Sequence, residues 1–150
     1  MRIGIGADQH GFRLKEILRE YLASEGHEIR DFGVASEDPI DYPDVAERVA
    51  RSVASGDTER AVLICGTGLG MAIAANKIPG IRAGTVSDPY SAERLAKSND
   101  AQIICLGGRT IGVEVAQMLV DRYLASEFQG GDSARKVAKI EALEHRGVAG

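Results

Sequence analysis

Short apolar runs alternate with longer amphipathic segments along the chain, and this alternation is the feature that most restricts its fold. Each apolar run is typical of a buried strand, and the segment after it has the spacing of a helix. The five strands are expected at residues 2–7, 27–32, 61–65, 81–86 and 101–106. Strands joined by helices over short connections form parallel sheets that are covered on both faces. The sequence therefore predicts the α/β class, with a five-stranded parallel sheet in one domain over residues 1–150.

The helices between and after these strands have recognisable ends. They are expected at residues 12–25, 44–55, 69–76, 89–97, 111–126 and 133–145. Pro43 suits a first turn, and Asp88 followed by Pro89 suits a cap and a first turn. The first helix should bury one face, which carries Phe12, Leu14, Ile17, Leu18, Tyr21 and Leu22.

Composition and charge exclude several classes of partner. The chain has 44% hydrophobic residues, 27% charged residues and a formal net charge of -4. A nucleic-acid partner is not expected, because proteins that bind duplexes usually carry a basic surplus. No apolar run reaches 18 residues, and no charged segment followed by an apolar one opens the chain, so neither a membrane span nor a signal peptide is expected.

The two cysteines, Cys65 and Cys105, both lie in apolar runs. This placement favours reduced thiols in the cytoplasm over a disulfide framework. The spacings CxxC and HxxxH are absent, so no metal is expected. No organic cofactor is expected either.

Ligands of parallel sheets bind beyond the carboxyl ends of the strands, near the point where the strand order reverses. That rule selects Asp8, Cys65, the loop 66–70, Asp88 with the preceding serine, and the turn 107–109. Asp8 either caps the first helix or contacts a ligand. Arg109 either binds an anion or meets a helix end across an interface. His10 is interpreted as a loop or first-turn residue, the alternative being a catalyst.

The loop after the third strand, GTGLG, alternates glycine with other residues. Glycines let backbone N–H groups approach an anion, and the following helix N-terminus adds about half a positive charge. The pattern favours a site for an oxyanion or a phosphate, the alternative being a tight turn. It is not a P-loop, since no Gly-Lys-Ser/Thr follows. A dinucleotide site with Asp88 on the ribose remains a further alternative, although the spacing is GxGxG rather than GxGxxG.

Cys65 immediately precedes this loop, whereas Cys105 lies inside a strand run. Free cysteines are usually small buried hydrophobic residues, and Cys105 is interpreted in that way. A helix N-terminus and nearby amide donors favour a negatively charged sulfur. Cys65 is therefore a candidate for removing a carbon-bound proton while amides hold the oxygen that becomes negative, which is enediolate chemistry.

Four segments of the chain resemble the family of type B ribose-5-phosphate isomerases and galactose-6-phosphate isomerases. They are CGTGLGMAIAANKIPGIRAG, DYPD, DPYSAERLAKSNDAQI and LASEFQGG. The resemblance implies a Rossmann-like three-layer α/β/α sandwich with a five-stranded parallel sheet. It further implies a homodimer or dimer of dimers with sites at the subunit interface. The implied reaction is metal-free aldose–ketose isomerisation of a sugar phosphate through a cis-enediolate.

The same resemblance implies a role for individual residues. Cys65 matches the proton-transferring base, Thr67 a hydroxyl that assists proton movement, and Asp8 a residue that holds sugar hydroxyls; these three form the predicted catalytic set. The amides that match the anion hole are those of Gly66, Thr67, Gly68, Leu69 and Gly70. Asn99 matches a second residue on the sugar hydroxyls.

Three further residues match the walls and the phosphate ligands of the family's site. Tyr42 matches a pocket wall and Arg109 a phosphate ligand. Lys136 aligns with one of two phosphate-binding arginines. The other arginine aligns with Asp132, which would repel phosphate. From the residues alone, Arg135, Lys136 and Lys139 of the last helix are interpreted as a solvated face, although one such cation folding back over the site would complete a phosphate pocket.

Two histidines expected from the resemblance are replaced. Gln9 stands where a histidine usually follows Asp8, and Ser98 stands where a histidine opens the furanose ring. A serine cannot take over the proton-shuttling role of an imidazole near neutral pH. Tetrose 4-phosphates need no such group, since their phosphate blocks the hydroxyl that would close a ring. The hypotheses are an isomerase of the ribose 5-phosphate type, a tetrose-phosphate isomerase, a nucleotide-binding module without isomerase activity, and a regulatory protein that has lost the chemistry.

Overall fold

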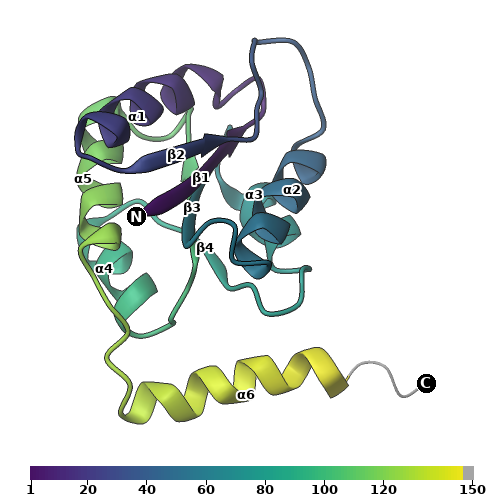
Figure 1. Ribbon diagram of the computed structural model, residues 1–150, viewed down its shortest axis with the longest axis vertical. Helices are drawn as coiled ribbons and strands as arrows, with labels where there is room; N and C mark the ends of the chain where they lie inside the picture. The colour runs from purple at the N-terminus through teal and green to yellow at the C-terminus, as the bar shows by residue number, and fades with distance from the viewer. Residues whose placement is uncertain (147–150) are drawn as a thin grey trace.

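The structure is a computed structural model that describes residues 1–146. Its five strands are parallel and lie in the order β2-β1-β3-β5-β4 (Figure 1). They are β1 (Arg2–Ala7), β2 (Glu28–Asp31), β3 (Arg60–Cys65), β4 (Ala83–Thr85) and β5 (Ile103–Gly107). The order reverses between β1 and β3, because β2 pairs with one side of β1 and β3 with the other. The carboxyl ends of β1 and β3 are therefore the expected position of a ligand.

Five helices cover the two faces of this sheet (Figure 1). They are α1 (Phe12–Ser24), α2 (Tyr42–Ala54), α3 (Leu69–Ala75), α4 (Pro89–Lys97) and α5 (Val113–Leu124). Leucine and alanine side chains of α1, α4 and α5 pack with Ile5 and Ile64 in one core cluster. Residues of α2 and α3 pack with Leu63 and Cys65 in the other. The three layers confirm the predicted α/β/α sandwich.

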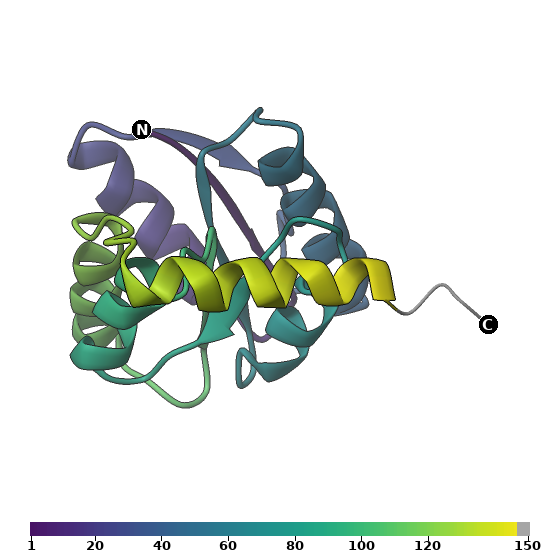
Figure 2. The ribbon, with the colours of Figure 1, turned by 90° about the horizontal axis from the view of Figure 1, so that it is seen from below.

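The last helix, α6 (Asp132–Arg146), lies outside these layers, across one end of the sandwich (Figures 1 and 2). The Glu144 carboxylate accepts a hydrogen bond from Gly80 N at 2.9 Å, and Arg82 pairs with Glu141 at 3.0 Å. Both partners precede β4, so α6 lies at the edge of the sheet where the strands begin. Val137 is the buried residue of this helix. Among residues 1–146, no helix combines the length and the apolar character needed to cross a lipid bilayer.

The predicted elements all exist, and some of their ends differ. Strand β4 is shorter than predicted because Ile81 N donates to Ile78 O in a preceding turn. Helix α5 begins two residues later than predicted, since Thr110 N and Ile111 N both donate to Gly107 O. Residues 147–150 of the predicted domain lie outside the described part.

Candidate active site

Cys65 ends β3 and is paired with Gly107 of β5, so its side chain lies at the carboxyl edge of the sheet. Its sulfur accepts a hydrogen bond from Gly68 N at 3.2 Å. Cys65 is 5% exposed, beneath the glycine loop. The predicted link between a thiol and a loop amide is therefore present in the structure.

Cys105 shares a core cluster with Cys65 but has different surroundings. It lies in the middle of β5, opposite Leu63, and is fully buried. Burial, and then the nearby Cys65, raise the pKa of the Cys105 thiol. A buried thiol that resists ionisation fits the predicted structural role of this residue.

The glycine loop is closely packed on both sides. Gly68 has a φ of 79°, in the left-handed region that glycine adopts without strain. A Cβ built on Gly68 would lie 2.9 Å from the carbonyl carbon of Leu106. A Cβ on Gly70 would lie 2.5 Å from the ring of Tyr42. Glycine is therefore needed at Gly68, where the φ angle and the Leu106 backbone leave no room for a side chain, so the tight-turn interpretation holds whether or not the loop also binds an anion. At Gly70 the neighbour is the side chain of Tyr42, which is 40% exposed.

Asp8 follows β1, next to this loop. Its Oδ1 accepts hydrogen bonds from His10 N at 2.9 Å and Gly11 N at 3.1 Å. The N-cap of α1 is Gly11, which has no side-chain cap. Asp8 thus stabilises the turn before α1 rather than capping the helix, which corrects one of the two predicted alternatives.

A cavity of about 550 Å³ opens beside Asp8. Gln9, His10 and Tyr42 line it, together with Ile40, Asp41, Pro43 and Asp44. Gln9 Oε1 accepts a hydrogen bond from Ile40 N at 3.1 Å, which fixes the direction of the amide. Cys65 does not line this cavity. The cavity thus brings together Asp8, Gln9 and Tyr42 of the predicted set, with the sulfur below the adjacent loop.

Arg109 and His10 flank the glycine loop. Arg109 N donates to Gly66 O at 3.0 Å, and a Cβ on Gly66 would meet Arg109 Cδ at 3.7 Å and His10 Cβ at 3.9 Å. The Arg109 guanidinium is exposed and makes no ion pair within residues 1–146. This position suits an anion held at Gly66 to Gly70. His10, interpreted from the sequence as a loop or first-turn residue, also lines the cavity beside Asp8.

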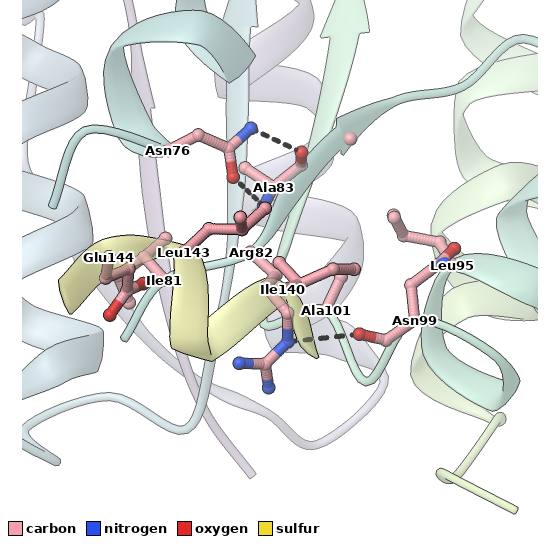
Figure 3. A pocket seen from close by; sticks show the side chains of 11 residues that line it. Asn76, Ile81, Arg82, Ala83, Leu95, Asn99, Ala101, Ile140, Leu143 and Glu144 are labelled. Atoms are coloured by element: carbon pink, nitrogen blue, oxygen red, sulfur yellow. Dashed lines mark hydrogen bonds between the residues drawn. The ribbon is translucent and has the colours of Figure 1, made fainter. Parts of the chain in front are cut away.

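Asn99 and Lys136 lie elsewhere. Asn99 precedes β5 by four residues and lines a cavity of about 580 Å³ next to α6 (Figure 3). Lys136 is an exposed residue near the start of α6. Both therefore lie at the edge where strands begin, opposite Cys65. Within one chain Lys136 does not lie over the predicted site, because α6 is held at Gly80 and Arg82, at the opposite edge.

Ser98, at the position expected for a ring-opening histidine, and Asp88, the candidate for a ribose contact, each bond to a neighbouring residue. Ser98 Oγ accepts a hydrogen bond from Arg94 Nε at 2.8 Å. Asp88 caps α4 by accepting from Ser91 N at 2.8 Å, and this bond lowers the pKa of the Asp88 carboxyl. The cap role predicted for Asp88 is confirmed. The carboxylate oxygen that caps α4 is already bonded to Ser91 N, so a contact with a ribose would compete with this bond.

Comparisons with known proteins extend over nearly the whole chain. A sequence model of the Ribose/Galactose Isomerase family matches residues 3–140. Ribose-5-P isomerase B of Listeria innocua is 47% identical over 146 residues, covering 97% of this chain and 99% of the relative. D-erythrulose-4-phosphate isomerase of Pectobacterium atrosepticum is 46% identical over 148 residues, covering 97% of each chain.

A solved structure agrees in fold as well as in sequence. Ribose-5-phosphate isomerase B of Clostridium thermocellum superposes with a TM-score of 0.96 at 46% identity, covering 97% of this chain and 98% of that one. The resemblance predicted from the glycine loop and its neighbours is thereby confirmed. The chain belongs to the ribose/galactose isomerase family.

Proposed function

We propose that the protein interconverts the aldose and ketose forms of a phosphorylated sugar through a cis-enediolate. The observation that carries this proposal is the hydrogen bond from Gly68 N to Cys65 Sγ at the carboxyl edge of the sheet. An amide donor aimed at sulfur favours its negatively charged form, which is the form that accepts a proton. The family relationship supports the same reaction class.

The proton and the electrons are accounted for by two transfers. Cys65 removes the proton from the carbon next to the carbonyl, and the electron pair of that C–H bond forms the enediolate. The same sulfur returns the proton to the neighbouring carbon, while a proton moves between the two oxygens. The hydroxyl of Thr67 is the group that assists this second movement. Amides at the start of α3 have no carbonyl partner within the helix and stabilise the negative oxygen.

The remaining residues bind the substrate. Asp8, Gln9 and Tyr42 surround the 550 Å³ cavity, whose size suits a small sugar phosphate. Arg109 supplies a cation beside the loop. These positions support binding of the sugar at the cavity and of the phosphate at the loop.

Solvent deuterium exchange tests this reaction directly. The purified protein in D₂O should introduce deuterium at C1 or C2 of an added sugar phosphate, as seen by NMR, because only a working base exchanges that proton. A protein that binds the sugar phosphate without exchange would be a regulatory relative. Binding of NAD or FMN without exchange would instead favour the nucleotide-binding alternative.

Ser98 and Gln9 favour a tetrose 4-phosphate as the substrate. The Ser98 hydroxyl is bonded to Arg94, and the Gln9 oxygen to Ile40 N, so neither position supplies an imidazole that could open a ring. An open-chain tetrose phosphate needs no such step. We expect kcat/KM to be higher for erythrulose 4-phosphate than for ribose 5-phosphate. The reverse order would make the pentose phosphate the substrate.

We also infer that the protein is a homodimer. Each of its sites would combine the carboxyl edge of the sheet in one copy with the opposite edge of the sheet in the other copy. Asn99 and Lys136 lie opposite Cys65 in one chain, so only another copy can bring them to the same substrate. Both edges carry exposed apolar side chains: Leu69 at the start of α3 is 58% exposed, and Leu143 of α6 is 61% exposed. A two-fold dimer would cover both and form two identical sites. Light scattering distinguishes this dimer from a dimer of dimers.

We propose a cytoplasmic location from the reduced state of the two thiols. Cys65 and Cys105 are both free and buried, which supports the reducing cytoplasm predicted from the sequence.

A further inference from the structure

Thr85 is the last residue of β4 and lies at the same sheet edge as Cys65. It is paired with Cys105 of β5, two residues before the end of that strand. Its side chain points toward the glycine loop: Thr85 Oγ1 donates to Gly68 O at 2.8 Å. No role in the site follows from the sequence for this residue.

Thr85 contacts Gly68 with both branches of its side chain. Besides the hydroxyl bond, its Cγ2 lies 3.0 Å from a Cβ built on Gly68. The Leu106 backbone closes the other side, with its carbonyl carbon at 2.9 Å from the same point. Gly68 is therefore held between the ends of β4 and β5, in its left-handed conformation.

The amide of Gly68 points at the sulfur. Gly68 N donates to Cys65 Sγ, while Gly68 O accepts from Thr85. The two groups belong to one residue, so fixing the carbonyl restricts the φ and ψ angles that aim the N–H. Ala72 N also donates to Gly68 O at 3.2 Å, so the turn keeps one bond when the threonine hydroxyl is removed.

We propose that Thr85 is a positioning residue that holds Gly68 so that its amide stabilises the negatively charged sulfur of Cys65. The proposal rests on the proposed role of Cys65 as the base. Thr85 does not touch the substrate; it acts through Gly68. Losing its hydroxyl lets the φ and ψ angles of Gly68 change and weakens the bond from Gly68 N to sulfur, while the cavity near Asp8 stays as it is.

The test compares Thr85→Val, which keeps the shape but lacks the hydroxyl, with Thr85→Ser, which keeps the hydroxyl. Iodoacetamide alkylation of the Cys65 peptide is followed by mass spectrometry at about pH 7 and about pH 10, above the usual ionisation range of a thiol. Thr85→Val should alkylate several-fold more slowly at pH 7 and equally fast at pH 10. Thr85→Ser should restore the wild-type rate at pH 7. The peptide of buried Cys105 is the internal control.

Kinetics supply a second measurement on the same variants. Thr85→Val should lower kcat by about the same factor as the alkylation rate at pH 7, with KM changed less than about twofold. Melting temperatures show whether each variant is folded, and Thr85→Ala replaces the valine variant should the latter unfold.

Several outcomes overturn the inference. Equal alkylation of wild type and Thr85→Val at pH 7 means that the hydroxyl has no effect on the sulfur. If Thr85→Val lowers the alkylation rate by the same factor at both pH values, the substitution has changed the access of the reagent to Cys65 and not the charge of its sulfur. Wild-type protein whose Cys65 does not react at either pH removes the proposed base as well. If the alkylation rate depends on Thr85 but the wild-type protein has no isomerase activity, this inference holds and the proposed function is wrong.

Discussion

At the scale of single residues, two cysteines of similar burial differ in what surrounds the sulfur. Cys105 is enclosed by the core in the middle of a strand, and its thiol is held in the neutral form. Cys65 stands at a strand end, where the amide of Gly68 donates a hydrogen bond to its sulfur. The two residues lie two positions apart in the pairing of β3 with β5 and share one core cluster. The two sulfurs therefore differ in their hydrogen-bond partners, although both are buried.

Replacing each cysteine by alanine separates the two roles. Cys65→Ala should abolish deuterium exchange and isomerisation while the protein stays folded, because the base is lost at the edge of the core. Cys105→Ala should keep both activities and lower the free energy of unfolding by about 1–2 kcal/mol through the small cavity left behind. Exchange assays and urea unfolding measure the two effects. Loss of fold in both variants would return Cys65 to a structural role.

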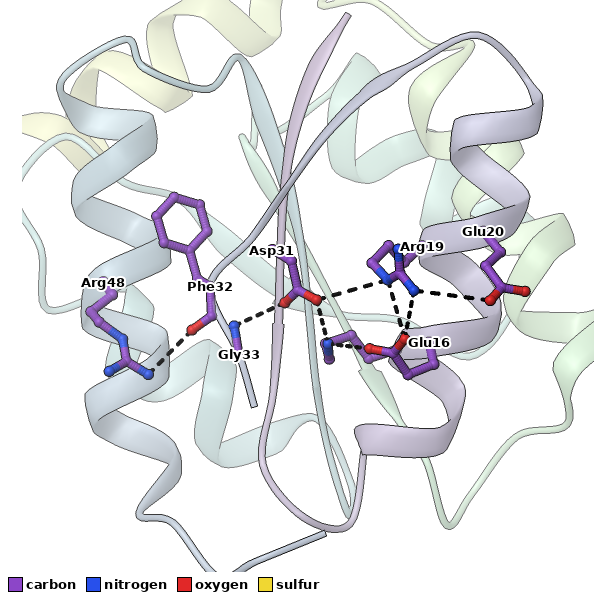
Figure 4. Close-up of polar contacts among 8 residues, drawn as sticks. Glu16, Arg19, Glu20, Asp31, Phe32, Gly33 and Arg48 are labelled. Carbon is purple, nitrogen blue, oxygen red and sulfur yellow. Dashed lines mark hydrogen bonds and ion pairs between the residues drawn. The ribbon is translucent and has the colours of Figure 1, made fainter. Parts of the chain in front are cut away.

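At the scale of elements, an ionic network joins α1 to the edge strand β2 (Figure 4). Lys15 is fully buried and contacts Glu16 and Asp31, both at 2.7 Å. Arg19 also contacts Glu16 at 2.7 Å. The sequence predicted Ile17 on the buried face of α1, but Ile17 is 40% exposed and Lys15 takes the inner position. Apolar periodicity cannot reveal this exchange, because the partner carboxylate Asp31 comes from another element.

This network predicts a dependence of stability on pH. Hydrogen bonds from Arg19 and then Lys15 lower the pKa of Glu16 below its ordinary value of 4.5. Because the folded-state pKa is the lower one, the stabilisation is present above about pH 4.5 and is lost as the pH falls through the folded value. Arg19→Gln should therefore lose stability at pH 7 and lose less at pH 3. Urea unfolding at both pH values measures this difference.

The control for that experiment is Arg30→Gln. The Arg30 side chain is exposed and forms no ion pair in the described residues, so its replacement should change stability equally little at both pH values. If Arg19→Gln changes the free energy of unfolding as little as Arg30→Gln does at both pH values, the ionic network does not stabilise the protein.

At the scale of the whole molecule, the sequence predicted the sheet, the layers and the edge that carries Cys65. Those features depend on the local periodicity of apolar residues and on the rule that ligands bind at the carboxyl ends of parallel strands. Both can be applied to a single sequence. It did not predict that Asn99 and Lys136 lie at the opposite edge. The position of Lys136 depends on where α6 is held, through Arg82 and Glu141. Asn99 lies in the connection from α4 to β5, at the edge where β5 begins. The role of Thr85 was missed for a similar reason, since its partner Gly68 belongs to another strand-to-helix loop.

Mixing two inactive variants tests whether sites combine two copies. Cys65→Ala and Asn99→Ala should each have little activity alone. After dissociation and random reassociation, mixed dimers would hold one site with both native residues, which gives about a quarter of the wild-type activity. The assay is the isomerisation rate before and after mixing, with light scattering to confirm the dimers. Unchanged low activity in confirmed mixed dimers would place Asn99 outside the site.

The distance of α6 and Asn99 from Cys65 has a consequence for how the protein responds to dilution. When each site needs a neighbouring copy, specific activity follows the mass-action balance between single and paired chains. A cell that produces little of this protein would then hold mostly folded but idle chains, and a small rise in synthesis would increase flux more than proportionally.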